Sequence, residues 1–110
     1  MAYVVAVFDD LLLGSNVLGM LRAAGHEAEL VPAARAQPYG ADVIIVDLGS
    51  AADLDRLAAD APQAKRVGVY SHVDVSQRDR ARAAGFDLAV PRSRMAREGA
   101  ALVAQVLSRG

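Results

Sequence analysis

The stretch ADVIIVDL, residues 41–48, decides the fold. Its apolar centre is short, unbroken and rich in β-branched residues, and it ends at a carboxylate, Asp47. A run of this kind predicts a strand buried on both faces, which is typical of a parallel sheet covered by helices. Similar runs recur along the chain, at residues 3–8 and 66–70 and, more weakly, at 28–31 and 87–90.

Helical patterns lie between these strands. We expect helices over residues 13–24, 51–61, 76–84 and 93–107, because each stretch places apolar residues on one helical face. Ser76 and Ser93 are predicted to begin the last two of them, and Gly25 and Gly85 to end the first and third. The stretch 32–40 has room for only a short helix, since a proline stands at each side of it.

Alternation of strands and helices through the whole chain predicts an α/β fold with one domain, residues 1–110, and leaves no place for a linker. Parallel strands need crossover connections, and these are right-handed, so five strands separated by helices give an open sheet. We therefore expect a flavodoxin-like, doubly wound five-stranded parallel sheet with strand order 2-1-3-4-5.

Composition excludes several classes of protein. With 110 residues, 54% of them hydrophobic, the chain can bury a core of its own. Its net charge of −1 and pI of about 6.0 argue against nucleic-acid binding. The absence of cysteine excludes disulfides, a thiol nucleophile and a cysteine-bound metal. No signal peptide or membrane-spanning run is visible, so we expect a cytoplasmic protein without a membrane partner.

Polar residues follow four of the predicted strands. In an open α/β sheet, a site forms beyond the carboxyl ends of the strands, where the strand order reverses. Asp9, Asp10 and Asp47 would meet there, and three neighbouring carboxylates favour a cation such as Mg²⁺. Ser71 and Arg92 could contact a phosphoryl group in the same crevice. An aspartate after a strand is also a common turn former or helix cap, so each one alone carries little weight.

At these positions the chain resembles the receiver domains of bacterial two-component response regulators. The resemblance rests on the acidic pair after VVAVF, on ADVIIVD, on the serine after RVGVY, and on ARAAGFD at residues 81–87. It implies that Asp9, Asp10 and Asp47 hold Mg²⁺. It also implies that a histidine kinase or phosphotransfer protein phosphorylates Asp47, with Ser71 and Arg92 contacting the phosphoryl group.

The chain departs from the receiver pattern near its last predicted strand. The family's Lys-Pro pair is missing: an ungapped count places Arg92 and Ser93 there, whereas a one-residue gap places Val90 and Pro91 there. An arginine keeps the charge, but its planar fork does not replace a compact ammonium. Ala89 stands where the family has its aromatic switch residue, which removes the usual rotamer switch.

Other charged residues lie near the predicted crevice or on the predicted helices. His72 follows Ser71 and could approach the crevice, although an ordinary loop histidine is the more frequent case. Arginines gather on the last two predicted helices, where receivers meet partners, and they could bind an acidic partner or support a homodimer. They are Arg78, Arg80, Arg82, Arg92, Arg94 and Arg97.

Three functions remain open from the sequence. The first is a stand-alone receiver-like signalling module, not an enzyme in the usual sense, that is phosphorylated on Asp47 with Mg²⁺ and binds a downstream protein. The second is a phosphorylation-independent pseudo-receiver that serves for docking or dimerisation. The third is a flavodoxin-like domain that binds a small ligand in the strand-end crevice, which the apolar stretch at residues 11–13 supports slightly.

Overall fold

The computed structural model describes residues 1–71 and 74–109. Five parallel strands form one sheet in the order β2-β1-β3-β4-β5, which confirms the predicted topology. The strands are β1 (Tyr3–Val7), β2 (Glu27–Val31), β3 (Val43–Asp47), β4 (Lys65–Tyr70) and β5 (Leu88–Pro91). The helices are α1 (Leu11–Ala23), α2 (Leu54–Asp60), α3 (Val75–Ala83) and α4 (Arg92–Leu107).

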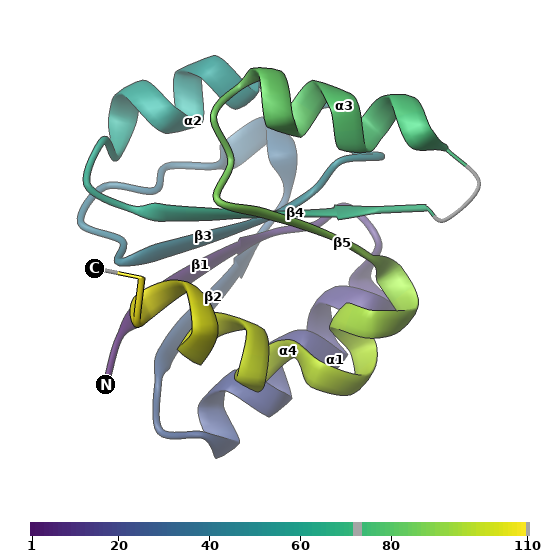
Figure 1. Ribbon diagram of the computed structural model, residues 1–110. Coiled ribbons are helices and arrows are strands. Elements are labelled where there is room, and N and C mark those ends of the chain that lie inside the picture. Colours follow the sequence, from purple (N-terminus) through teal and green to yellow (C-terminus); the bar gives the residue numbers. More distant parts are fainter. Residues whose placement is uncertain (72–73, 110) are drawn as a thin grey trace.

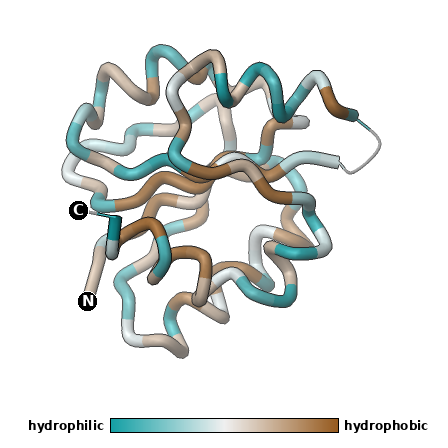
Figure 2. Tube along the Cα trace, viewed as in Figure 1, coloured by the Kyte–Doolittle hydropathy of each residue, from teal (hydrophilic) through white to brown (hydrophobic). Residues whose placement is uncertain are grey.

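The helices cover both faces of the sheet, as the buried strands require. Figure 1 shows α1 and α4 on one face and α2 and α3 on the other. The strands are the most hydrophobic part of the molecule, and Figure 2 shows them enclosed between the more polar helices. β3 is buried over its whole length, in agreement with the double-faced burial that its sequence predicts.

Two apolar cores result, one on each face. The core under α1 and α4 is built around Phe8, Leu21 and Met95, together with side chains of the strands. The core under α2 and α3 contains Ile44 from β3 and Leu57 from α2. Alternate residues of β3 enter opposite cores, since successive side chains of a strand point to opposite faces.

The connection between β2 and β3 contains no α-helix. The expected short helix is a single 3-10 turn, η1 (Ala33–Arg35), between the two prolines of this stretch. Gly25 and Gly85 have positive φ values of 91° and 79° and end α1 and α3, as predicted, because glycine adopts this conformation without strain.

The predicted starts of all four helices differ from the observed ones. α1 begins at Leu11 and α2 at Leu54, whereas the sequence predicted residues 13 and 51. The caps predicted for the last two helices are wrong. α3 begins at Val75 with Asp74 as its cap, because the Asp74 carboxylate accepts hydrogen bonds from both the backbone N–H and the hydroxyl of Ser76. α4 begins at Arg92, directly after Pro91, so Ser93 lies inside the first turn and does not cap it. The fixed φ of proline suits an entry into a helix without a side-chain cap.

Within the described part of the chain, no helix has both the length and the apolar character needed to cross a membrane. The carboxyl ends of β1, β3 and β4 lie at one edge of the sheet, where α1 and α4 also begin. That edge is where the candidate site lies.

Candidate functional site

Asp47 ends β3 and lies almost completely inside the protein. Its side chain is 5% exposed. Its Oδ1 accepts a hydrogen bond from the Gly49 N–H at 3.0 Å, and its backbone oxygen accepts one from the Ser50 hydroxyl at 2.6 Å. A buried carboxylate is costly unless donors surround it, and the turn after β3 supplies part of that compensation. Asp47 is therefore held by the turn and does not cap α2, whose cap is Asp53.

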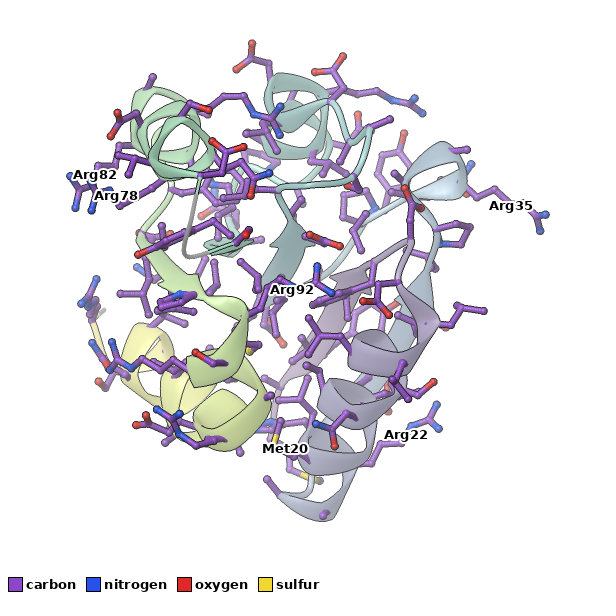
Figure 3. The ribbon with its side chains drawn as sticks, turned by 90° about the vertical axis from the view of Figure 1, so that its right-hand side faces the viewer. Met20, Arg22, Arg35, Arg78, Arg82 and Arg92 are labelled. Carbon is purple, nitrogen blue, oxygen red and sulfur yellow. The ribbon has the colours of Figure 1, made fainter. Side chains whose placement is uncertain are left out.

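Arg92 supplies the positive charge. One terminal nitrogen of its guanidinium lies 3.4 Å from Asp47 Oδ2, and the other donates to Asp10 Oδ2. Figure 3 looks at this edge of the sheet and shows the Arg92 side chain at its centre. Arg92 thereby joins the first residue of α4 to the end of β3 and to the start of α1, as a planar guanidinium with several donors can do.

Asp10 has two roles at once. It is the N-cap of α1, because its Oδ1 accepts hydrogen bonds from the backbone N–H groups of Leu12 and Leu13. The Leu13 N–H is the largest cause that lowers the pKa of Asp10 below its ordinary value, and Arg92 adds to it, while partial desolvation opposes both. The helix-cap interpretation thus holds for Asp10, together with an ion pair in the crevice.

Asp9 is directed elsewhere. It is exposed, and its Oδ1 accepts a hydrogen bond from the Ala33 N–H at 3.0 Å. Ala33 is the first residue of η1, so this contact ties the end of β1 to the β2–β3 connection. The structure brings Asp10, Asp47 and Arg92 together, and it gives Asp9 a different partner.

This arrangement does not fit a divalent metal. Among the described residues, no group of three His, Cys, Asp or Glu side chains is placed to hold one. Both oxygens of Asp10 and both oxygens of Asp47 already have donors from the chain, and the guanidinium of Arg92 supplies the cation. Mg²⁺ prefers carboxylate oxygens and water in a near-octahedral shell, and here the guanidinium of Arg92 contacts the Oδ2 atoms of both carboxylates.

Ser71 lies at the same edge, directly after β4. Its backbone N–H donates to Gln77 Oε1 of α3 at 3.1 Å. A contact of its hydroxyl with a phosphoryl group stays a prediction. His72 lies outside the described residues.

Three residues at this edge have structural roles that were not predicted from the sequence. Gln77 holds Ser71 from one side, and Arg80 donates to the Leu48 backbone oxygen at 3.0 Å, so α3 is fastened to the turn after β3. Ser50 supports the same turn through its hydroxyl. The contacts of Gln77 and Arg80 depend on how α3 packs on the sheet, which residue spacing cannot reveal, whereas the Ser50 contact is local to the turn.

A groove of about 690 Å³ adjoins the crevice. The beginnings of α1 and α4 form its two sides, and it contains both apolar and polar side chains: Asp10, Leu12, Leu13, Ser15, Asn16, Arg92, Ser93 and Ala96. Leu12 is 85% exposed at its border. The groove extends the site from the crevice toward the helix surface.

Of the arginines on α3 and α4, Arg92 lies in the crevice and Arg80 binds the turn after β3. Figure 3 shows Arg78 and Arg82 beside each other on α3; Arg82 is exposed, while the Arg78 side chain is 34% exposed and pairs with Asp79. Arg94 pairs with Glu98 at 3.6 Å, one helical turn further along α4. α3 and α4 together carry six arginines against one aspartate and one glutamate, so these two helices are basic in a chain whose net charge is −1.

No family model matches this chain, and no curated protein matches it. Solved structures match it over nearly its whole length. A CheY-like response regulator receiver domain protein from Methanospirillum hungatei has a TM-score of 0.83 and 16% identity, and the match covers 99% of this chain and 95% of that one. A response regulator receiver protein from Burkholderia phymatum has a TM-score of 0.79 and 22% identity, with 98% and 96% covered.

A third similar structure is larger. NtrX from Brucella abortus, solved in complex with ATP, has a TM-score of 0.85 and 20% identity, and the match covers 98% of this chain but 27% of NtrX. These similarities extend from the first strand to the last helix and agree with the observed strand order. The chain has the fold of the response-regulator receiver domains.

Proposed function

We propose that this protein is a receiver-like signalling module that acts by binding other proteins. The fold supports this proposal, since it matches receiver domains over 98–99% of the chain. The edge of the sheet supports it too, because Asp10, Asp47 and Arg92 meet where the strand order reverses, which is where open α/β sheets carry their sites. Fold alone does not determine function. Whether such a module is phosphorylated on Asp47 or works without phosphorylation depends on the residues of the crevice.

The geometry favours the phosphorylation-independent version. One observation carries this choice: Arg92 binds Asp10 and Asp47 at the same time. Both oxygens of Asp47 are engaged, Oδ1 by the Gly49 N–H and Oδ2 by Arg92, and each contact lowers the nucleophilicity of the carboxylate. Ala89 also favours this version. It stands at the position of the family's aromatic switch residue, so the rotamer change that normally follows phosphorylation could not occur.

Phosphotransfer gives the first test. The protein is incubated with acetyl phosphate and MgCl₂, and the intact mass is measured by mass spectrometry beside that of Asp47→Asn. We expect no phosphoryl adduct that depends on Asp47. An adduct present in the wild type and absent from Asp47→Asn would restore the phosphorylated version, with a histidine kinase or phosphotransfer protein as partner.

The basic surface of α3 and α4 is the proposed contact with a partner. Arg78 and Arg82 lie together there, and a surface with an excess of positive charge attracts an acidic partner and speeds its association. A homodimer through the same surface is the alternative, for which Asp79 could supply the opposite charge. Wild type and Arg78→Glu/Arg82→Glu are compared by sedimentation and by affinity purification from the source cells. If both proteins sediment alike and retain the same partners, this surface has no role in association.

The groove beside the crevice favours a second candidate, a small-ligand binder. Its volume of about 690 Å³ lies in the range of ligand sites, and its mixed lining suits a molecule with an apolar part. Ligand binding to the folded state would raise Tm in the absence of Mg²⁺. A thermal-shift screen of metabolites without metal tests this candidate, and the variant Asn16→Leu should abolish any stabilisation that arises in the groove.

A further inference from the structure

The crevice of this protein contains an acidic pair and one arginine that reaches both members. Asp10 and Asp47 come from the start of α1 and the end of β3, while Arg92 comes from the start of α4. The ion pairs span 82 and 45 positions of the sequence. Three elements that are far apart in the chain are therefore joined by one guanidinium.

Each carboxylate oxygen of Asp10 and Asp47 already has a partner within the protein. In Asp47 the N–H of Gly49 takes one oxygen and Arg92 the other. In Asp10 the first turn of α1 takes one oxygen and Arg92 the other. Two carboxylates side by side repel each other unless a cation lies between them, and here the cation is a side chain.

The choice of arginine matters for this geometry. A lysine ammonium is a compact point charge, whereas a guanidinium presents donors on two terminal nitrogens at fixed separation. The two nitrogens of Arg92 go to two different carboxylates. Arg92 is also the first residue of α4, so the same contact fixes where that helix leaves the sheet.

We propose that Arg92 is the resident cation of the crevice: it replaces a divalent metal by neutralising Asp10 and Asp47, and it positions the starts of α1 and α4 against β3. The crevice is then complete without metal. Removing the guanidinium should leave the carboxylates without a cation and make the protein respond to divalent metal. This inference rests on the proposed function only in treating the crevice as a receiver-type site.

The test compares Arg92→Gln with the wild type and with Arg97→Gln. Arg97 lies on the same helix and is 69% exposed, so its variant removes the same charge without touching the crevice. Thermal unfolding is measured in 10 mM MgCl₂ and in NaCl of equal ionic strength. Backbone amide signals are recorded with substoichiometric Mn²⁺, which broadens the signals of residues near a bound ion.

We expect Tm of the wild type and of Arg97→Gln to be the same in both salts. Arg92→Gln should lose about 4–8 °C, and MgCl₂ should restore part of this loss. Mn²⁺ should broaden the amides at positions 10 and 47 in Arg92→Gln and leave them sharp in the wild type. The double variant Asp47→Asn/Arg92→Gln should be more stable than Arg92→Gln and insensitive to MgCl₂, since one carboxylate of the pair is gone.

Two results would overturn the inference. One is Mn²⁺ broadening at positions 10 and 47 in the wild type, because the arginine would then not exclude the metal. The other is an Arg92→Gln protein that behaves like Arg97→Gln in both salts. Arg92→Lys covers the case in which Arg92→Gln does not fold: it should lose stability but stay insensitive to MgCl₂. A failure of partner binding would refute the proposed function and leave this comparison unaffected.

Discussion

Replacing Asp47 by asparagine tests whether the crevice is an acidic cluster or a neutralised one. The substitution keeps the size of the side chain and one oxygen for the Gly49 N–H. It places an amide group, which donates hydrogen bonds, opposite the guanidinium of Arg92, which also donates. In an acidic cluster without a cation, the change would relieve repulsion and stabilise the fold. With Arg92 in place, it removes an ion pair.

The expected size of the effect follows from burial and distance. A hydrogen bond to a charged group contributes about 1.5–3 kcal/mol, and Asp47 is almost fully buried. Arg92 is 36% exposed and the contact is 3.4 Å long, so solvent screens part of the interaction. We expect Asp47→Asn to lose about 1–2 kcal/mol, which corresponds to a fall in Tm of about 5–10 °C.

Urea unfolding at pH 7, followed by far-UV circular dichroism, measures this difference. Asp79→Asn is the matched control, because Asp79 is 64% exposed and its contact with Arg78 is long, at 3.8 Å. We expect the control to stay within about 0.5 kcal/mol of the wild type. An Asp47→Asn protein as stable as the wild type, or more stable, would refute the neutralised crevice.

Further variants test the rest of the structure. Gly14→Ala should destabilise the protein by about 1–3 kcal/mol, because the added methyl would lie 3.1 Å from Phe8 Cβ and closer still to Leu30. Gly19→Ala, in the same helix with open space around it, should stabilise the protein by about 1 kcal/mol. The urea midpoints of the two variants measure this difference. Because the pKa of Asp10 is lowered in the folded state, its contribution to stability is complete above the unfolded pKa of about 4 and is lost as the pH falls through the lower folded pKa. The stability of Asp10→Asn should therefore fall less steeply than that of the wild type below about pH 4 in an acid unfolding experiment. Arg80→Ala should cost about 1 kcal/mol and raise the hydrogen exchange of amides in the turn after β3, because it removes the bond to a backbone oxygen there.

The sheet was predictable because its signals are local. Continuous β-branched runs such as residues 41–48 indicate strands buried on both faces, and the alternation with helices leaves few topologies. The structure confirms the strand order and the short connection at η1. The predicted starts of α3 and α4 were wrong because several residues near each start can cap a helix. The tertiary path of the chain places Asp74 and Pro91 at the cap positions.

The site was predictable only in part. Strand ends place Asp10, Asp47 and Arg92 at one edge, and the structure joins them. Sequence could not show that Asp9 binds the Ala33 N–H, since that contact depends on how the β2–β3 connection folds back. Nor could it show which cation the carboxylates use, because an arginine and a metal satisfy the same charge balance.

The most direct test of a receiver-like module that works without phosphorylation is the amide spectrum before and after addition of MgCl₂ with beryllofluoride, a mimic of a phosphoryl group on aspartate. We predict that the spectrum of the wild type changes no more than that of Asp47→Asn. Shifts clustered at Asp9, Asp10, Asp47 and Ser71 that disappear in Asp47→Asn would contradict this account and assign the chemistry of a phosphorylated receiver to Asp47.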